Sequence, residues 1–174
     1  MKYITETFLE YPDNSSVAVI FYCGGCDRNC PGCHNTELQN YIKFDSEQVI
    51  GELVDYCKRL NTNKIVLCGG DPLYHKNLSL TGDILRTLGG RYDICIYTGA
   101  NIDEVKALDI TGFKFVKCGI FEASKFVGAT KTDDYIRFAT TNQELYDSQF
   151  NLLSKDGTYY FNEEKWYDTR CNRN

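Results

Sequence analysis

Four short apolar runs, separated by amphipathic segments, constrain the fold of this chain more than any other feature. The first run, residues 15–23, is almost continuously β-branched and aromatic, which is typical of a strand buried on both faces of a parallel sheet. Similar runs follow at 64–68, 93–97 and 113–118. Strands that alternate with helices through short, right-handed connections predict an α/β fold with a parallel sheet that curls.

The segments between these runs carry helix signals. Asp45, with Gln48 three positions later, predicts a helix cap, and apolar residues then recur at helical spacing as far as Asn61. Residues 78–88 predict a second helix, and residues from about 102 to 108 predict a short third helix. We therefore expect one helix after each of the first three strands.

Toward the C-terminus the alternation weakens. Residues 154–160 contain an Asp-Gly pair flanked by a hairpin-like pattern, and residues 162–174 are polar and are expected to fray. By length the chain, residues 1–174, is expected to be one domain. We place its core at about residues 15–145, followed by a C-terminal hairpin and polar tail at 146–174.

Composition excludes several functional classes. The nine cysteines are odd in number, and a chain of 174 residues can form a core without disulfides, so a disulfide framework is not expected. No charged-then-apolar leader opens the sequence, so a secreted protein is not expected either. The formal charge is −5, and no basic cluster is longer than Lys58-Arg59. No apolar run approaches the ~20 residues of a membrane span. We therefore expect a cytoplasmic protein that binds neither nucleic acid nor membranes.

The first strand leads directly into a loop in which four cysteines occupy eleven positions. Thiolates at this density either form disulfides or hold a soft metal centre. Because α/β sheets bind ligands at the carboxyl ends of their strands, the loop lies where an active site is expected. The four cysteines are Cys23, Cys26, Cys30 and Cys33.

The spacing of these cysteines favours a metal centre. Structural zinc sites separate two Cys-x2-Cys pairs by about a dozen residues or more, and the ferredoxin order of spacings also differs from this one. Three thiolates, from Cys26, Cys30 and Cys33, can hold three irons of a [4Fe-4S] cluster and leave the fourth iron free for a substrate. Cys23 ends an apolar strand and is better explained as a buried small residue. The other cysteines predict buried thiols: Cys57, Cys68, Cys95, Cys118 and Cys171.

These residues resemble a known family. Cys26-x3-Cys30-x-Gly32-Cys33, followed by His34 and Asn35, resembles the signature loop of radical S-adenosylmethionine (radical SAM) enzymes. More narrowly, the stretch from Cys30 to Asn35 resembles the activating proteins of anaerobic (class III) ribonucleoside-triphosphate reductases. Further matches keep the family order over most of residues 16–145: LCGGDPLY at 67–74, and weaker ones at 96–99, 119–122 and 141–143.

The resemblance implies a shortened, open (βα) barrel of mainly parallel strands, of the radical SAM type. It also implies that the free iron binds S-adenosyl-L-methionine, and that an electron from the cluster cleaves it to methionine and a 5′-deoxyadenosyl radical. Such a protein is an oxidoreductase, a glycyl-radical-enzyme activase that takes hydrogen from a glycine of anaerobic ribonucleotide reductase. Its expected partners are that reductase and an electron donor such as flavodoxin or ferredoxin.

The same resemblance implies the cofactor contacts. Gly69 and Gly70 lack a Cβ, so their backbone can approach the methionine end of the cofactor. Asp71 either accepts a hydrogen bond from the cofactor ammonium or caps the turn. The backbone around Cys33, from Gly32 to His34, is expected beside the adenosine, with the His34 ring stacking rather than acting as a base.

Two alternatives remain open. A small radical SAM enzyme acting on a free metabolite needs polar groups over the cluster, for which Lys117, Glu122 and Lys125 are candidates. A four-cysteine electron-transfer or zinc-binding module would use Cys23 as its fourth ligand. The chain departs from the family pattern at Cys118 and at Phe138-Ala139, and these departures bear on partner recognition.

Overall fold

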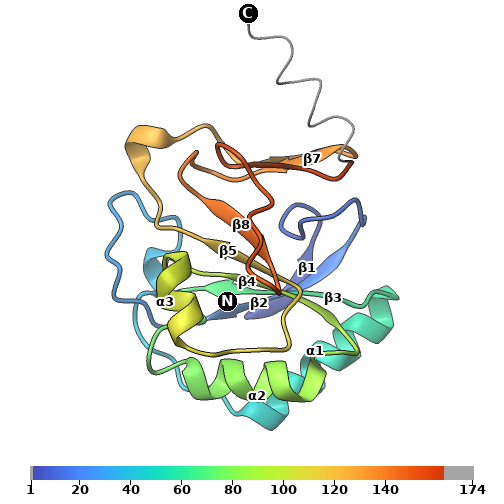
Figure 1. Ribbon diagram of the computed structural model, residues 1–174. Helices are drawn as coiled ribbons and strands as arrows, with labels where there is room; N and C mark the ends of the chain where they lie inside the picture. The colour runs from blue at the N-terminus through green and yellow to red at the C-terminus, as the bar shows by residue number, and fades with distance from the viewer. Residues whose placement is uncertain (1, 163–174) are drawn as a thin grey trace, which may run out of the picture.

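Four parallel strands form the centre of the fold, as the sequence predicts (Figure 1). In this computed structural model, which describes residues 2–162, strands β2 to β5 lie side by side in sequence order. Their buried, β-branched residues explain this arrangement, because both faces of the sheet are covered. The strands are β2 (Ala18–Cys23), β3 (Lys64–Gly69), β4 (Asp93–Tyr97) and β5 (Phe115–Cys118).

Two antiparallel strands that the sequence analysis did not predict extend this sheet. β1 (Ile4–Thr7) pairs with β2, and β8 (Glu144–Asp147) pairs with β5, giving the order β1-β2-β3-β4-β5-β8. The chain is thus a mixed α/β protein with a mostly parallel central sheet. The strand predicted from residue 15 begins at Ala18, because Asp13 accepts a hydrogen bond from the Ser15 amide at 2.7 Å and holds a turn there.

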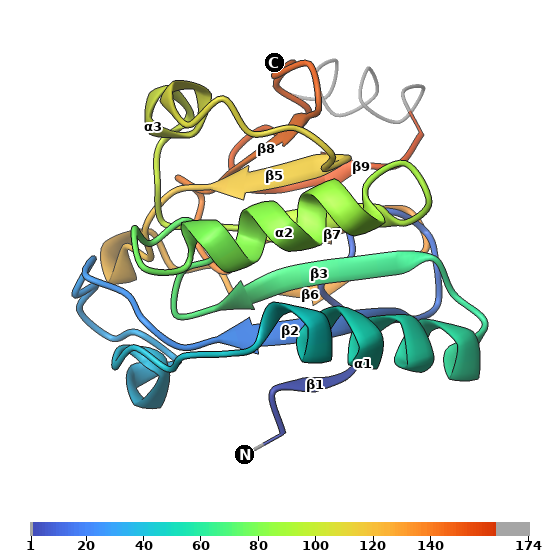
Figure 2. The same cartoon turned by 90° about the horizontal axis from the view of Figure 1, so that it is seen from below.

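Three helices follow the first three parallel strands, as predicted. They are α1 (Ser46–Leu60), α2 (Leu78–Leu88) and α3 (Ile102–Ala107). Asp45 caps α1 by accepting a hydrogen bond from the Gln48 amide at 2.9 Å. Helices α1 and α2 lie together on one face of the sheet (Figure 2), where buried side chains such as Leu53 and Ile84 form the larger core. Short 3-10 turns occur at η1 (Thr36–Leu38) and η2 (Ala123–Lys125).

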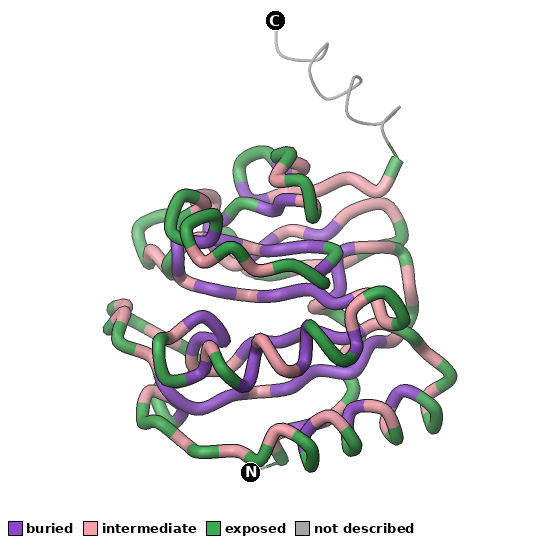
Figure 3. The backbone as a smooth tube through the Cα atoms, turned by 60° about the horizontal axis from the view of Figure 1, so that its bottom comes forward, coloured by how far each residue is buried: buried purple, intermediate pink, exposed green. Residues whose placement is uncertain are grey.

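A second, small antiparallel sheet lies across the opposite face of the central sheet from α1 and α2 (Figure 1). It consists of β6 (Thr130–Lys131), β7 (Tyr135–Arg137) and β9 (Thr158–Tyr160). Its residue Ile136 packs, together with Phe138, into a separate core cluster. Figure 3 shows the result: buried positions follow the central strands, and exposed positions gather in the loops.

At the site of the predicted C-terminal hairpin the structure has a turn. Asp156 and Gly157 have φ values of 49° and 73°, and Lys155 and Thr158 exchange backbone hydrogen bonds of 2.8 and 2.9 Å. The strand after this turn, β9, pairs with β7 instead of running back along the preceding segment. The predicted polar tail from residue 163 onward, with Cys171, lies outside the described residues. Within residues 2–162, no helix combines the length and apolar character needed to cross a membrane.

Candidate iron–sulfur and cofactor site

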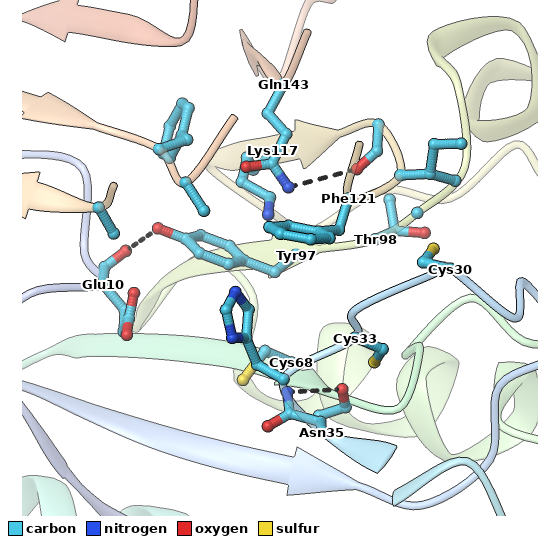
Figure 4. Close-up of a pocket in the computed structure, with 18 of the residues that line it drawn as sticks. Glu10, Cys30, Cys33, Asn35, Cys68, Tyr97, Thr98, Lys117, Phe121 and Gln143 are labelled. Carbon is cyan, nitrogen blue, oxygen red and sulfur yellow. Dashed lines mark hydrogen bonds between the residues drawn. The ribbon is translucent and has the colours of Figure 1, made fainter. Parts of the chain in front are cut away.

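A cavity of about 470 Å³ opens at the carboxyl ends of the parallel strands (Figure 4). This size is within the range of small-molecule and cofactor sites. The loops that follow β2, β3, β4 and β5 all contribute to its wall, as expected for an α/β sheet. Among the lining residues are Cys26, Cys30, Cys33, His34, Gly69, Gly70, Thr98 and Gly99.

Backbone hydrogen bonds from Gly25 and Cys26 hold the start of the cysteine loop in place. The Gly25 amide donates to the Leu38 carbonyl at 2.8 Å, and the Cys26 amide donates to the Gln39 carbonyl at 3.0 Å. The side chain of Asn35 donates to the Gly69 carbonyl at 3.2 Å. The loop after β2 is therefore joined directly to the Gly-Gly turn after β3.

The structure separates the four cysteines of the loop into two kinds. Cys26, Cys30 and Cys33 are free, partly exposed and face the cavity. Cys23 is 2% exposed, its thiol donates to the Cys68 carbonyl at 3.2 Å, and burial raises its pKa. The expectation that Cys23 is a buried residue is thus confirmed. The same holds for the remaining cysteines of the described range, which are buried: Cys57, Cys68, Cys95 and Cys118.

The thiols of the loop have the chemistry that an iron–sulfur cluster requires of its ligands. Within residues 2–162, no three His, Cys, Asp or Glu side chains are grouped so that they could hold one metal ion. A [4Fe-4S] cluster takes one thiolate per iron, so its ligands surround the cluster instead of converging on one point. The three partly exposed thiols of the loop match that requirement, whereas Cys68, which also lines the cavity, is a buried strand residue.

Asp71 is buried and does not line the cavity. Its carboxylate accepts hydrogen bonds from Thr98 Oγ1 at 2.8 Å, the Leu73 amide at 2.9 Å and the Gly99 amide at 3.1 Å. The Nε atom of Arg28 is 3.8 Å away. Burial raises the pKa of Asp71 in spite of these contacts. Of the two roles expected for Asp71, the observed contacts are those of a group that holds the turns after β3 and β4 together.

The two glycines at the end of β3 are required by close backbone packing. A Cβ on Gly70 would lie 2.5 Å from the Gly25 carbonyl oxygen and 2.6 Å from that of Leu38. Gly69 has a φ of 111°, and a Cβ there would lie 2.5 Å from the Cys23 carbonyl oxygen. Both glycines also line the cavity, so close approach of the cysteine loop is one reason for them and the predicted cofactor contact stays a prediction.

His34 lines the cavity, and both His34 and Gly32 lie beside Phe121, which also lines it. The His34 ring is exposed and meets the Phe121 ring edge to face, with 4.8 Å between ring centroids. Gly32 has a φ of 76°, and its missing Cβ would lie 3.3 Å from the Phe121 ring. Of the polar residues proposed to lie over a cluster, Lys117 lines the cavity. Glu122 and Lys125 instead form an ion pair of 2.8 Å, and neither lines the cavity.

The inner end of the cavity contains residues that the sequence analysis missed. Tyr97 donates its hydroxyl hydrogen to the backbone carbonyl of Glu10, and the Glu10 side chain lines the cavity with Lys117 (Figure 4). Glu10 lies in a connection without a motif, so no local signal marks it. Tyr97 and Lys117 lie side by side because they are paired in the register of β4 and β5, which the sequence alone does not give.

The partly buried Glu10 carboxyl gives a prediction about stability and pH. Burial raises its pKa in the folded protein above the ordinary value of 4.5. A carboxyl with a raised folded pKa stabilises the fold below its unfolded pKa, and this contribution is lost as the pH rises through the folded pKa. Glu10→Gln should therefore become more stable relative to the wild type as the pH is raised from about 4 to 7.

Urea unfolding across this pH range measures the effect. Glu122→Gln is the matched control, because it removes a carboxyl outside the cavity. Parallel pH profiles for Glu10→Gln and the wild type would contradict the prediction.

Comparison with known proteins agrees with this site. The chain belongs to the family described as the 4Fe-4S single cluster domain, whose model matches residues 15–145 and so includes the whole cysteine loop. Two curated relatives are named anaerobic ribonucleoside-triphosphate reductase-activating protein. The one from Enterobacteria phage T4 is 24% identical over 106 residues, covering 58% of this chain and 68% of the relative. The one from Pasteurella multocida (strain Pm70) is 24% identical over 116 residues, covering 62% and 72%.

No solved structure matches this chain significantly. The resemblance to the activating proteins, first seen in the cysteine loop and the LCGGDPLY segment, is confirmed by these relatives. An iron–sulfur cluster is supported in the same way by the family match.

Proposed function

We propose that this protein is a radical SAM activase that installs a glycyl radical on an anaerobic ribonucleotide reductase. The observation that carries the proposal is the set of three partly exposed thiols, Cys26, Cys30 and Cys33, around one cavity at the carboxyl edge of a parallel sheet. Membership of a 4Fe-4S family and the names of the two relatives support the same conclusion.

In this proposal the three thiolates hold one [4Fe-4S] cluster in the cavity. When bound, the cluster supplies the electron that cleaves S-adenosylmethionine, and the resulting 5′-deoxyadenosyl radical abstracts hydrogen from a glycine of the reductase. In the same proposal the cofactor contacts His34, Gly69 and Gly70, which line the cavity, and Gly32, which lies beside the lining residue Phe121. Asp71 acts indirectly. Its carboxylate accepts hydrogen bonds from Thr98 and Gly99, and these two residues line the cavity.

The proposed architecture is a shortened, open (βα) barrel of the radical SAM type, within one domain whose core spans about residues 15–145. Strands β2 to β5 form the barrel part, and the β6-β7-β9 sheet covers the face that helices leave free. The mouth of the cavity stays open, so a large partner is able to cover it. Flavodoxin or ferredoxin in a reducing cytoplasm would supply the electron.

Anaerobic reconstitution with iron and sulfide tests this function. We expect a reduced [4Fe-4S] electron paramagnetic resonance signal that shifts when S-adenosylmethionine is added. Adding the anaerobic ribonucleotide reductase from the same source should then give 5′-deoxyadenosine and a glycyl radical signal on the reductase. Stoichiometric zinc uptake, or a cluster signal that ignores S-adenosylmethionine, would overturn the proposal.

A further inference from the structure

Two charged side chains at the inner end of the cavity are not used by the cluster or by the proposed cofactor contacts. Lys117 extends from β5, and Glu10 extends from the connection after β1. Within residues 2–162, neither the Lys117 ammonium nor the Glu10 carboxylate has a hydrogen bond or an ion pair. Tyr97 lies between the two side chains (Figure 4). The two groups attract each other without direct contact, so the cavity presents one acidic and one basic side chain that are each able to bind a ligand.

Such an arrangement is unfavourable in the free protein. Burying a charge costs free energy unless it is paired, and burial raises the pKa of Glu10 and lowers that of Lys117. The Lys117 Nζ atom lies 4.5 Å from the centroid of the Tyr97 ring and 5.8 Å from that of Phe138. These cation–π contacts offset only part of the cost of burial. A ligand that carries both a cationic and an anionic group would satisfy both side chains.

The mouth of the same cavity is apolar and exposed. Leu9, Ile120 and Phe126 line it and are 52%, 39% and 57% exposed. Their chain neighbours Phe8 and Val127 are 64% and 40% exposed. Large exposed apolar side chains that surround a cavity are typical of a surface that a macromolecule covers. A small zwitterion inside the cavity would leave this rim uncovered, whereas a polypeptide segment would cover it.

We propose that the cavity binds a segment of the partner polypeptide that presents a basic side chain to Glu10 and an acidic side chain to Lys117, with apolar side chains on the rim. This inference rests on the proposed function, because it gives the recognition chemistry by which the partner's glycine enters the cavity. Opposite charges at two fixed points also set the direction in which the segment lies.

A peptide array tests the inference with the reconstituted protein under anaerobic conditions. The array holds nine-residue peptides with a glycine in the centre and an apolar residue at each end. Each peptide carries one arginine and one aspartate, and the array covers every pair of the remaining positions. Matched peptides carry glutamine and asparagine instead. We expect at least one charged arrangement to bind tenfold more tightly than its neutral counterpart. Equal binding of charged and neutral peptides would overturn the proposal.

Variants assign each charge to its residue. Glu10→Gln should remove the preference for peptides with arginine over those with glutamine. Lys117→Met should remove the preference for peptides with aspartate over those with asparagine. Lys117→Arg should retain the preference for aspartate. Glu122→Gln and Lys125→Met are matched controls, because this ion pair lies outside the cavity, and they should bind like the wild type. A loss of binding in the controls, or full binding in both cavity variants, would contradict the assignment.

Two further readouts separate this inference from the proposed function. Partner-free cleavage of S-adenosylmethionine should be equal in the wild type and in Glu10→Gln and Lys117→Met, whereas a failed proposed function would leave no cleavage in any of them. Free arginine and free aspartate should not compete with the peptides at concentrations comparable to those of the peptides. Competition by either would assign the charges to a free metabolite instead of a polypeptide.

Discussion

Replacing Cys26, Cys30 or Cys33 with serine should remove the iron–sulfur cluster and lower the rate of glycyl radical formation by more than about 100-fold. Residues that only support metal ligands already cost about 10–100-fold when mutated, so the loss of a ligand should cost more. Of the four cysteines in the loop, these three line the cavity and Cys23 does not. Iron and sulfide analysis after reconstitution, together with the yield of 5′-deoxyadenosine, measures the effect.

Cys23→Ser is the control for these variants. Cys23 is only three positions before Cys26, but it is 2% exposed and its thiol donates to the Cys68 carbonyl. A serine hydroxyl can donate in the same direction, so the variant should keep its cluster and lose only stability. Cluster loss in Cys23→Ser, equal to that in Cys26→Ser, would favour the four-cysteine module over the radical enzyme.

The sequence predicts well those parts of this molecule whose signals are local. The bounds of α2 and β4 agree with the predicted ranges, because an apolar period of helix or strand type is complete within each segment. Asp45 was identified as a cap because a side chain and an amide three residues later are sufficient for that contact. Cys23 was separated from the other cysteines by its place at the end of a buried strand.

The parts that the sequence did not predict depend on contacts between distant segments. β1 and β8 have four residues each, and they are strands only because β2 and β5 offer free edges. Glu10 lines the same cavity as Lys117 only because the chain after β1 contacts Tyr97 at the end of β4. The sequence marks Asp71 as a candidate site residue but does not predict its partners, because its three hydrogen-bond donors come from two turns that are far apart in the sequence. Local patterns carry no information about such pairings.

Gly70→Ala should lower the free energy of unfolding by about 3 kcal/mol, the upper part of the range for overpacking a buried site. The new methyl group would lie 2.5 Å from the Gly25 carbonyl oxygen and 2.6 Å from the Leu38 carbonyl oxygen. Both neighbours are backbone atoms, held by the hydrogen bond from the Gly25 amide to the Leu38 carbonyl. Neither can rotate away as a side chain would, so the cysteine loop itself must move. Denaturant unfolding measures the loss.

The same substitution at Gly51 should have the opposite sign. Gly51 lies on the exposed side of α1, and a Cβ there would meet nothing within 4 Å. Alanine at such a helix position is expected to stabilise the protein by about 0.5–1 kcal/mol. If Gly70→Ala instead unfolded like the wild type and only weakened the binding of S-adenosylmethionine, Gly70 would serve the cofactor and not the packing of the loop. A loss in both properties, with Gly51→Ala stabilised, would show that the turn which positions the thiols is also the turn that the fold depends on.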